Sequence, residues 1–187
     1  MKIPHLLPSD ALLIVDVQLD FCPGGALPVP EGNDVVRVLN AWIAGALAGG
    51  AMVLASRDWH PVGHPSFASQ GGPWPTHCLQ DTLGAAFHKD LHLPHETILV
   101  SKGTRFDKDQ YSAFDETGLA IALRRKDIRR VWIGGLALDV CVQATALDAV
   151  RAGFETHVIH QACRALSPAS RKTALGQMQD AGVALEE

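Results

Sequence analysis

Short apolar runs with the length of β-strands alternate with amphipathic, helix-length segments along the sequence. The clearest run is residues 11–17, ALLIVDV, whose continuous apolar character is typical of a strand covered on both faces, as in a parallel sheet. Strand patterns recur at 51–56, 95–100, 131–133, 156–160 and 183–185, and helical patterns lie at 33–48, 117–126, 139–150 and 168–181. The alternation predicts a three-layer α/β/α fold, with a mostly parallel sheet between two layers of helices. We expect one domain spanning residues 1–187.

Composition excludes several classes of function. A net charge of −4 without a basic cluster argues against a nucleic-acid partner. Because the longest apolar runs have only strand length, we expect no membrane span. The segment 1–10 lacks the apolar centre of a signal peptide, which favours a cytoplasmic location. The four cysteines show no CxxC spacing, a pattern that fits reduced thiols better than disulfides.

Reactive side chains stand where four of the predicted strands end. Asp16 closes the first run, Asp58 follows the second, Lys102 follows the third, and Cys141 comes shortly after the 131–133 run and its glycine pair. The carboxyl ends of parallel strands meet at one edge of a sheet, where such folds bind their ligands. We therefore expect these four residues to share one site.

Cys141 is the candidate nucleophile of this site. The chain should turn at Gly134 and Gly135, which are predicted to end the strand, and Cys141 then falls in the first turn of a helix that begins near Asp139. A helix N-terminus lowers a thiol's pKa and so favours the nucleophilic thiolate. The alternative is a buried structural cysteine, which is the commoner role.

Two neighbours at the predicted sheet edge favour catalysis. Asp16 can act as a general base toward the thiol of Cys141, and Lys102 can keep the carboxylate ionised. A structural ion pair between Asp16 and Lys102 is the alternative for these two residues alone. The convergence of all the reactive residues on one edge favours the nucleophile.

The long connection after the second strand carries metal-type ligands. Asp58 and His60 form a D-x-H pair, and His77 follows in the same loop. One carboxylate and two imidazoles can hold a zinc-like divalent ion and leave positions open for water or substrate. A single histidine in a loop is usually only solvated, but three ligands on one connection favour a metal site. The spacing of His64 from His60 does not fix its geometry, so its contribution stays open. The remaining histidines, which we expect to be surface or core residues, are His5, His88, His92, His95, His157 and His160.

Four motifs in order resemble one enzyme family. They are IVDVQLDFCPGGALPVPEG, RDWHPVGHPSF with GGPWPTHCLQDTLGAAF, SKGTRFDKDQYSAF, and GGLALDVCVQATALDA. Together they cover nearly the whole chain and resemble the nicotinamidase (pyrazinamidase) branch of the isochorismatase-like cysteine hydrolases. The resemblance implies a Rossmann-like sheet and hydrolysis of nicotinamide to nicotinic acid and ammonia, with pyrazinamide as a related substrate.

The resemblance also implies roles for individual residues. The catalytic triad would be Asp16, Lys102 and Cys141, and the metal ligands would be Asp58, His60 and His77. The amides of Ala137 and Cys141 would form an oxyanion hole, and Phe21 and Trp74 would lie on the two sides of a flat ring. Tyr111 would also line the pocket, and the Leu136–Ala137 peptide would be cis. One divalent ion would bind the ring nitrogen; we expect zinc, with manganese and iron as alternatives. Homo-oligomers are common in the family.

Three other functions compete with this interpretation. An N-carbamoyl or ureido amidohydrolase of the same superfamily would keep the triad but generally lacks the metal loop. Isochorismatase activity does not use a cysteine nucleophile. A non-catalytic binding protein on the same fold would tolerate loss of triad residues, yet Asp16, Lys102 and Cys141 are all present.

Overall fold

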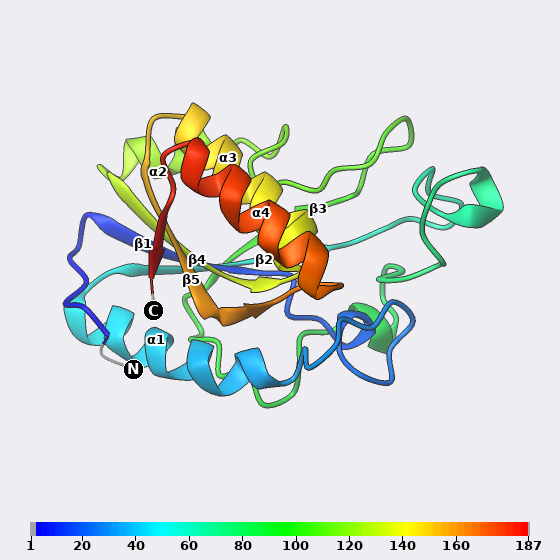
Figure 1. Cartoon of the computed structure of the whole chain (residues 1–187), viewed down its shortest axis with the longest axis horizontal. Coiled ribbons are helices and arrows are strands. Elements are labelled where there is room, and N and C mark those ends of the chain that lie inside the picture. Colours follow the sequence, from blue (N-terminus) through cyan, green and yellow to red (C-terminus); the bar gives the residue numbers. More distant parts are fainter. Residues whose placement is uncertain (1–2, 187) are drawn as a thin grey trace.

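A computed structural model describes residues 3–186 of the chain, and its centre is a parallel sheet (Figure 1). The sheet has six strands in the order β3-β2-β1-β4-β5-β6, and every neighbouring pair is parallel. The strands are β1 (Asp10–Val15), β2 (Met52–Asp58), β3 (Ile98–Lys102), β4 (Arg130–Leu136), β5 (Glu155–Arg164) and β6 (Ala184–Glu186). The predicted parallel α/β sheet is therefore confirmed.

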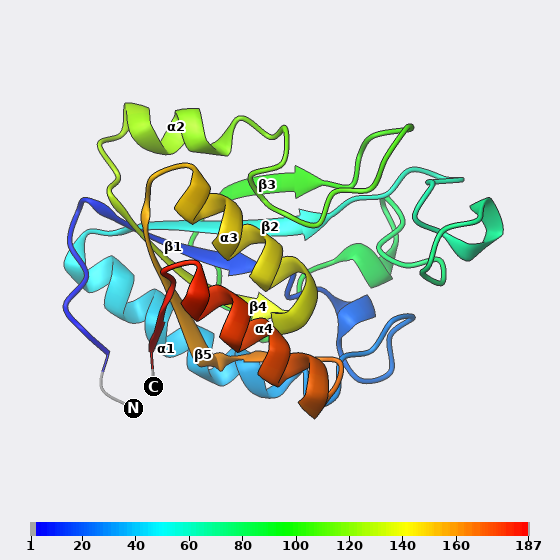
Figure 2. The same cartoon turned by 45° about the horizontal axis from the view of Figure 1, so that its top comes forward.

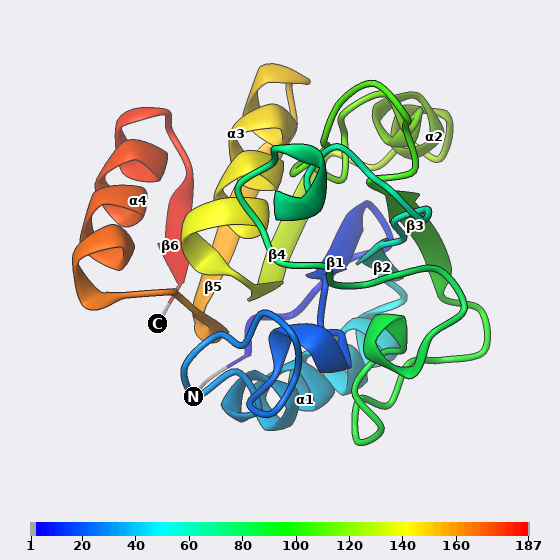
Figure 3. The same cartoon turned by 90° about the vertical axis from the view of Figure 1, so that its right-hand side faces the viewer.

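Helices cover both faces of the sheet, as Figures 2 and 3 show. They are α1 (Asp34–Gly49), α2 (Leu119–Arg125), α3 (Gln143–Arg151) and α4 (Pro168–Asp180). On one face, Leu39 and Trp42 of α1 pack in a buried cluster with Leu12 of β1. On the other face, Ala146 of α3 and Met178 of α4 belong to a second cluster. In the described part of the chain, no helix combines the length and the apolarity needed to cross a bilayer.

The strand order places a crevice between β1 and β4. From β1 the chain moves outward through β2 to β3, then returns to the other side of β1 with β4 and continues outward to β6. At such a reversal the connections that leave neighbouring strands go to opposite faces, which opens a crevice at their carboxyl ends. Asp16 directly follows β1, and Cys141 lies on the segment that leaves β4. The topology thus carries both residues to the same opening.

The predicted end of the 131–133 strand at the glycine pair is wrong. Strand β4 continues through Gly134 and Gly135 to Leu136. Glycine is needed here for close approach, because a Cβ on Gly135 would lie 2.0 Å from the backbone oxygen of Val15, and φ at Gly135 is +140°. Gly135 therefore lets β4 lie against β1 up to the crevice, while a Cβ on Gly134 would lie 3.0 Å from both Ala162 of β5 and Leu39 of α1. Strand β3 also differs from the prediction, since it begins at Ile98 and includes Lys102.

Replacing Gly135 with alanine should destabilise the protein. An added side chain would meet the backbone of β1, and the φ at this position is one that L-residues rarely adopt. We therefore expect the free energy of unfolding to fall by about 3 kcal/mol. Denaturant unfolding measures the change. Gly176→Ala is the matched control: no atom lies within 4 Å of the added Cβ in α4, and alanine should stabilise that helix by roughly 0.5–1 kcal/mol. Equal stability of Gly135→Ala and the unchanged protein would contradict the close-approach argument.

Candidate functional site

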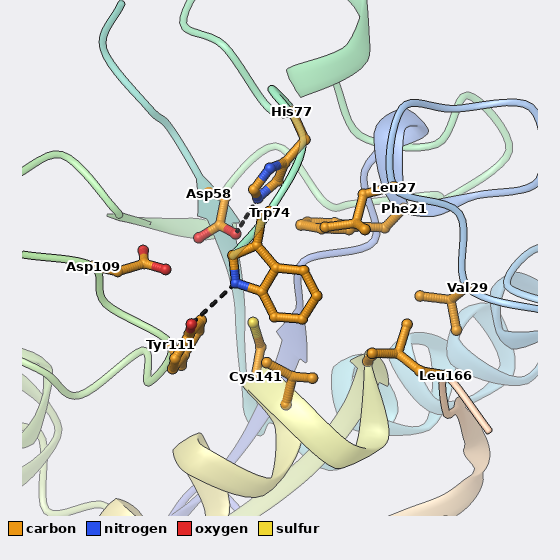
Figure 4. Close-up of a pocket in the computed structure, with 12 residues that line it drawn as sticks. Phe21, Leu27, Val29, Asp58, Trp74, His77, Asp109, Tyr111, Cys141 and Leu166 are labelled. Atoms are coloured by element: carbon orange, nitrogen blue, oxygen red, sulfur yellow. Dashed lines mark hydrogen bonds and ion pairs between the residues drawn. The ribbon is translucent and has the colours of Figure 1, made fainter. Parts of the chain in front are cut away.

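A cavity opens at the carboxyl edge of the sheet, over the β1–β4 crevice (Figure 4). Loops that follow β1, β2 and β3 form its sides, and the segment after β4 forms its floor. Its lining residues are Phe21, Leu27, Val29, Asp58, Trp74, His77, Asp109, Tyr111, Ala137, Val140, Cys141 and Leu166. The predicted site residues that come from four different strand ends therefore meet at one place.

The ammonium group of Lys102 is fully buried behind the cavity, in contact with Asp58 and Cys141 of its lining. Its Nζ lies 2.8 Å from Asp16 Oδ2 and 2.5 Å from Asp58 Oδ1. The same Nζ lies 3.4 Å from Cys141 Sγ. The hydroxyl of Ser56 donates to Asp16 Oδ1 at 2.7 Å, which holds the second oxygen of that carboxylate. One cation thus connects two carboxylates and a thiol.

Burial and charge set the protonation of these groups. Burial lowers the pKa of Lys102, but Asp16 and Asp58 outweigh it, so the pKa is raised and the ammonium stays charged. Burial raises the pKa of Asp16, and the opposing charge of Lys102 does not cancel that effect. Burial raises the pKa of Asp58, but the attraction of Lys102 outweighs it and the pKa is lowered. Asp58 is therefore ionised, whereas Asp16 is a stronger base than an ordinary aspartate.

The predicted lowering of the Cys141 pKa is wrong. Burial raises the pKa of this thiol, and the negative charges of Asp16 and Asp58 add to the effect, while Lys102 only partly opposes it. The resting side chain is therefore a thiol that must lose its proton to a base before it attacks. Its position beside Asp16 supplies such a base: ligand atoms of Asp16, Asp58 and Cys141 all lie within 4.8 Å of one another.

Cys141 sits on a π-helical turn, Leu138–Val142, between β4 and α3. Turns of this kind often occur at functional sites. The Leu136–Ala137 peptide before it is cis, as expected from the resemblance. The carboxylate of Asp139 does not cap the turn but accepts a hydrogen bond from the amide of Leu166 at 3.1 Å. This bond ties the turn that carries Cys141 to the segment of Leu166, which lines the cavity.

Asp58, His60 and His77 form a cluster beside the Lys102 network. Asp58 Oδ2 lies 3.6 Å from His60 Nε2 and 3.9 Å from His77 Nε2. The Nδ1 atoms of the two rings contact the carbonyl oxygens of Gly103, at 2.9 Å, and Pro75, at 2.7 Å. Because a carbonyl oxygen can only accept, each Nδ1 carries a hydrogen, and in the neutral ring each Nε2 keeps its lone pair. Both rings thus present a free nitrogen to the Asp58 oxygen.

The loop after β2 folds back on itself to bring His77 to His60. The amide of His60 donates to the Cys78 carbonyl at 3.0 Å, and the amide of Gln80 donates to the His60 carbonyl at 2.9 Å. The other side of His60 depends on Gly103, where an added Cβ would lie 2.4 Å from His60 Cε1. Backbone pairing and a glycine contact therefore position the cluster.

These residues fit a divalent metal ion. His60 Nε2 is a buried nitrogen with no hydrogen-bond partner among the described residues, which is costly unless something else binds its lone pair. One carboxylate and two imidazole nitrogens, each ring held by a backbone carbonyl, are a donor set for such an ion. The arrangement supports a candidate metal site directly beside the thiol.

The aromatic residues expected from the resemblance line the same cavity. In Figure 4 the indole of Trp74 crosses the cavity between Cys141 and His77, and Phe21 lies beside the His77 ring. Trp74 Nε1 donates to the Tyr111 hydroxyl at 3.0 Å, so Tyr111 fixes the plane of the indole. The site therefore has flat apolar walls as well as reactive groups.

Sequence reasoning missed several residues of the site. Gln18, which is buried, accepts a hydrogen bond from the Asp58 amide and donates to the Asp58 carbonyl, both at 2.8 Å. The sequence signal for Gln18 was its position as a polar residue two places after Asp16, at the end of the first predicted strand. Asp109 lines the cavity and, with His60 and His64, forms a second group of candidate metal ligands. Its only sequence signal was a carboxylate two residues before Tyr111.

Comparisons of sequence and of structure with known proteins agree on one family. The isochorismatase domain model matches residues 10–186. A nicotinamidase of Escherichia coli (strain K12) is 40% identical, over 96% of this chain and 95% of its own length. The crystal structure of the pyrazinamidase of Pyrococcus horikoshii in complex with zinc has a TM-score of 0.93 and 44% identity, covering 96% of this chain and 99% of that one. PnC1 from L. infantum, solved in complex with nicotinate, has a TM-score of 0.91 and 35% identity over 100% of this chain and 96% of that one. The chain belongs to the isochorismatase domain family.

Proposed function

We propose that this protein is a nicotinamidase, a hydrolase that converts nicotinamide to nicotinic acid and ammonia in NAD salvage and also accepts pyrazinamide. The observation that carries the proposal is the Lys102 network, in which one ammonium group holds Asp16, Asp58 and the Cys141 thiol beside an Asp/His cluster. Relatives named nicotinamidase and pyrazinamidase, similar along almost their whole length, support the choice of substrate.

In the proposed mechanism the first half forms a thioester. Asp16 accepts the proton of the Cys141 thiol, and the sulfur attacks the carboxamide carbon. The amides of Ala137 and Cys141 donate to the oxygen that gains negative charge. Asp16 then returns the proton to the nitrogen, the C–N bond breaks, and ammonia leaves the acyl-enzyme. Lys102 stays charged throughout and stabilises the thiolate as it forms.

In the second half, water cleaves the thioester. Asp16 accepts a proton from the attacking water, the C–S bond breaks, and the Cys141 sulfur takes the proton back as nicotinic acid leaves. Phe21 and Trp74 hold the flat ring from two sides and keep other water out. When bound at Asp58, His60 and His77, a divalent ion supplies a Lewis acid for the ring nitrogen and for water. We propose zinc as this ion, with manganese and iron as alternatives.

We propose three further properties of the chain. The chain is a single domain over residues 1–187, since one sheet includes strands from both ends of the described chain. It acts in the cytoplasm, where its buried free cysteines would stay reduced. It forms homo-oligomers, as relatives in the resembled family commonly do.

Replacing Cys141 with alanine should abolish ammonia release from nicotinamide. Without the sulfur no thioester forms, so we expect turnover to fall by more than about a thousandfold. The measurement is ammonia release by protein loaded with zinc, manganese or iron. Cys163→Ala is the matched control, since Cys163 is a buried thiol outside the cavity. Normal turnover by Cys141→Ala would exclude the assigned nucleophile. Release from a ureido or carbamoyl amide, but not from nicotinamide, would move the assignment to that substrate class.

Replacing His77 with alanine should weaken metal binding. The change removes one of two imidazole nitrogens that face Asp58 Oδ2, and we expect affinity for zinc to fall by more than about 100-fold. Competition with a chromophoric chelator measures the affinity directly. His92→Ala, an exposed histidine, serves as control. If the His77 variant bound zinc as tightly as the unchanged protein, the cluster would not be the metal site.

Replacing Tyr111 with phenylalanine should affect binding rather than chemistry. The change removes only the hydroxyl that accepts from Trp74 Nε1. If the lost hydrogen bond weakens substrate binding by about 1 kcal/mol, KM should rise roughly fivefold while kcat changes little. Steady-state kinetics with nicotinamide separates the two constants. A fall in kcat at constant KM would instead place Tyr111 in the chemical step.

A further inference from the structure

Ser56 carries a buried hydroxyl that has no role in the mechanism above. It lies within the sheet on β2, paired with Val15 of β1 on one side and Val100 of β3 on the other, and it is fully buried. Its hydroxyl donates to Asp16 Oδ1 at 2.7 Å. A hydroxyl has one hydrogen to donate, so this bond commits it to the carboxylate that serves as the base.

Ser56 holds the backbone of Asp16 as well as its side chain. The amide of Asp16 donates to the Ser56 carbonyl oxygen at 3.2 Å. Asp16 directly follows β1 and has a φ of +49°, a left-handed conformation that is uncommon for residues other than glycine. Such a conformation persists only where the surroundings enforce it. One serine therefore fixes both the backbone from which the carboxylate projects and the rotation of the carboxylate itself.

The two oxygens of Asp16 have different surroundings. Oδ1 accepts from Ser56, whereas Oδ2 forms an ion pair with Lys102 Nζ at 2.8 Å and has no hydrogen-bond partner among the described residues. The same Nζ lies 3.4 Å from Cys141 Sγ, so Oδ2 and the sulfur share one neighbour. A lone pair of Oδ2 is thus free to accept the thiol proton.

The hydrogen bond from Ser56 also decides where that proton stays. In the part of the chain that the structure describes, Asp16 Oδ1 is the hydrogen-bond acceptor of the Ser56 hydroxyl, and no second acceptor contacts it. A proton on Oδ1 would displace the hydroxyl hydrogen and leave it unpaired in a buried place, which is costly. The proton therefore remains on Oδ2, on the side of Lys102 and the sulfur.

We propose that Ser56 is a positioning residue for the general base: its hydroxyl occupies Oδ1 of Asp16 and so makes Oδ2 the oxygen that takes and returns the thiol proton. The inference rests on the proposed function, because it takes Asp16 as the base and Cys141 as the nucleophile. Ser56 acts through Asp16 and does not line the cavity. Its loss should slow proton transfer and leave the binding of substrate and metal unchanged.

Alkylation of Cys141 by iodoacetamide tests the proposal without nicotinamide. The thiolate is the reactive form, so the rate, followed by mass spectrometry of the Cys141 peptide in the zinc-loaded protein, reports how well Asp16 takes the proton. Ser56→Ala should slow alkylation by about 10–100-fold, the scale of one hydrogen bond to a charged group. For nicotinamide, kcat should fall by a similar factor at constant KM. Ser56→Thr, which keeps the hydroxyl, should recover most of both rates.

A double-mutant cycle separates this role from a structural one. In an Asp16→Asn background, Ser56→Ala should slow alkylation by no more than about twofold, because its effect passes through the Asp16 carboxylate. A merely structural serine would cause its full loss in either background. Zinc affinity and thermal unfolding of each variant should match those of its parent, which shows that the fold and the nearby Asp58 cluster are intact.

The matched control is Thr156→Val. Thr156, on β5 and outside the cavity, is also buried, and its hydroxyl donates to the Phe154 carbonyl at 3.0 Å. This variant should be alkylated as fast as the unchanged chain. Unchanged alkylation in Ser56→Ala, an equal loss in Thr156→Val, or a full loss in the Asp16→Asn background would overturn the proposal. Because alkylation needs no substrate, failure of the unchanged chain to hydrolyse nicotinamide would refute the proposed function and leave the result for Ser56 intact.

Discussion

The buried ammonium of Lys102 is the interaction on which the rest of the site depends. Burying a cation away from water is very unfavourable unless carboxylates contact it. Removing one partner of a buried ion pair typically costs about 3–5 kcal/mol. Asp16 and Asp58 are at 2.8 and 2.5 Å from its Nζ, and they follow or end different strands. The charge network therefore joins the carboxyl ends of β1, β2 and β3 around the position where the thiol of Cys141 enters from β4. Stability of this edge and placement of the Cys141 thiol have the same cause.

The network also changes what each member can do. Because Lys102 contacts both carboxylates, the two aspartates differ in character although they lie side by side. Burial raises the pKa of both carboxyls; for Asp58 the attraction of Lys102 outweighs it and the pKa is lowered, whereas for Asp16 burial keeps the pKa raised. Separation of two neighbouring carboxylates into a permanent anion and a base is how one site performs both charge stabilisation and proton transfer. The strand order makes this separation available at a single crevice.

Much of this arrangement could be predicted from the sequence, because it follows from local pattern. The apolar runs predict the parallel sheet, and residues at strand ends predict that Asp16, Lys102 and Cys141 meet. Other features depend on the tertiary structure. Gly134 and Gly135 look like a strand end, yet they continue β4, and at Gly135 the backbone of β1 approaches too closely for a side chain. The pKa of Cys141 is set by burial among carboxylates rather than by the local turn. Asp109 carries no local pattern of a ligand, and only the folding of two loops brings it to His60 and His64.

The two oxygens of Asp58 join the halves of the site into one unit. Oδ1 accepts from Lys102, which contacts the thiol, and Oδ2 faces the Nε2 atoms of His60 and His77. Gln18 holds the backbone of Asp58 on both its amide and its carbonyl, so this carboxylate has little freedom to rotate away. Any group that draws charge from Oδ2 must weaken the attraction of Oδ1 for Lys102, and the ammonium then interacts more strongly with Asp16 and the sulfur. The candidate metal cluster and the Cys141 thiol are therefore coupled through a single side chain.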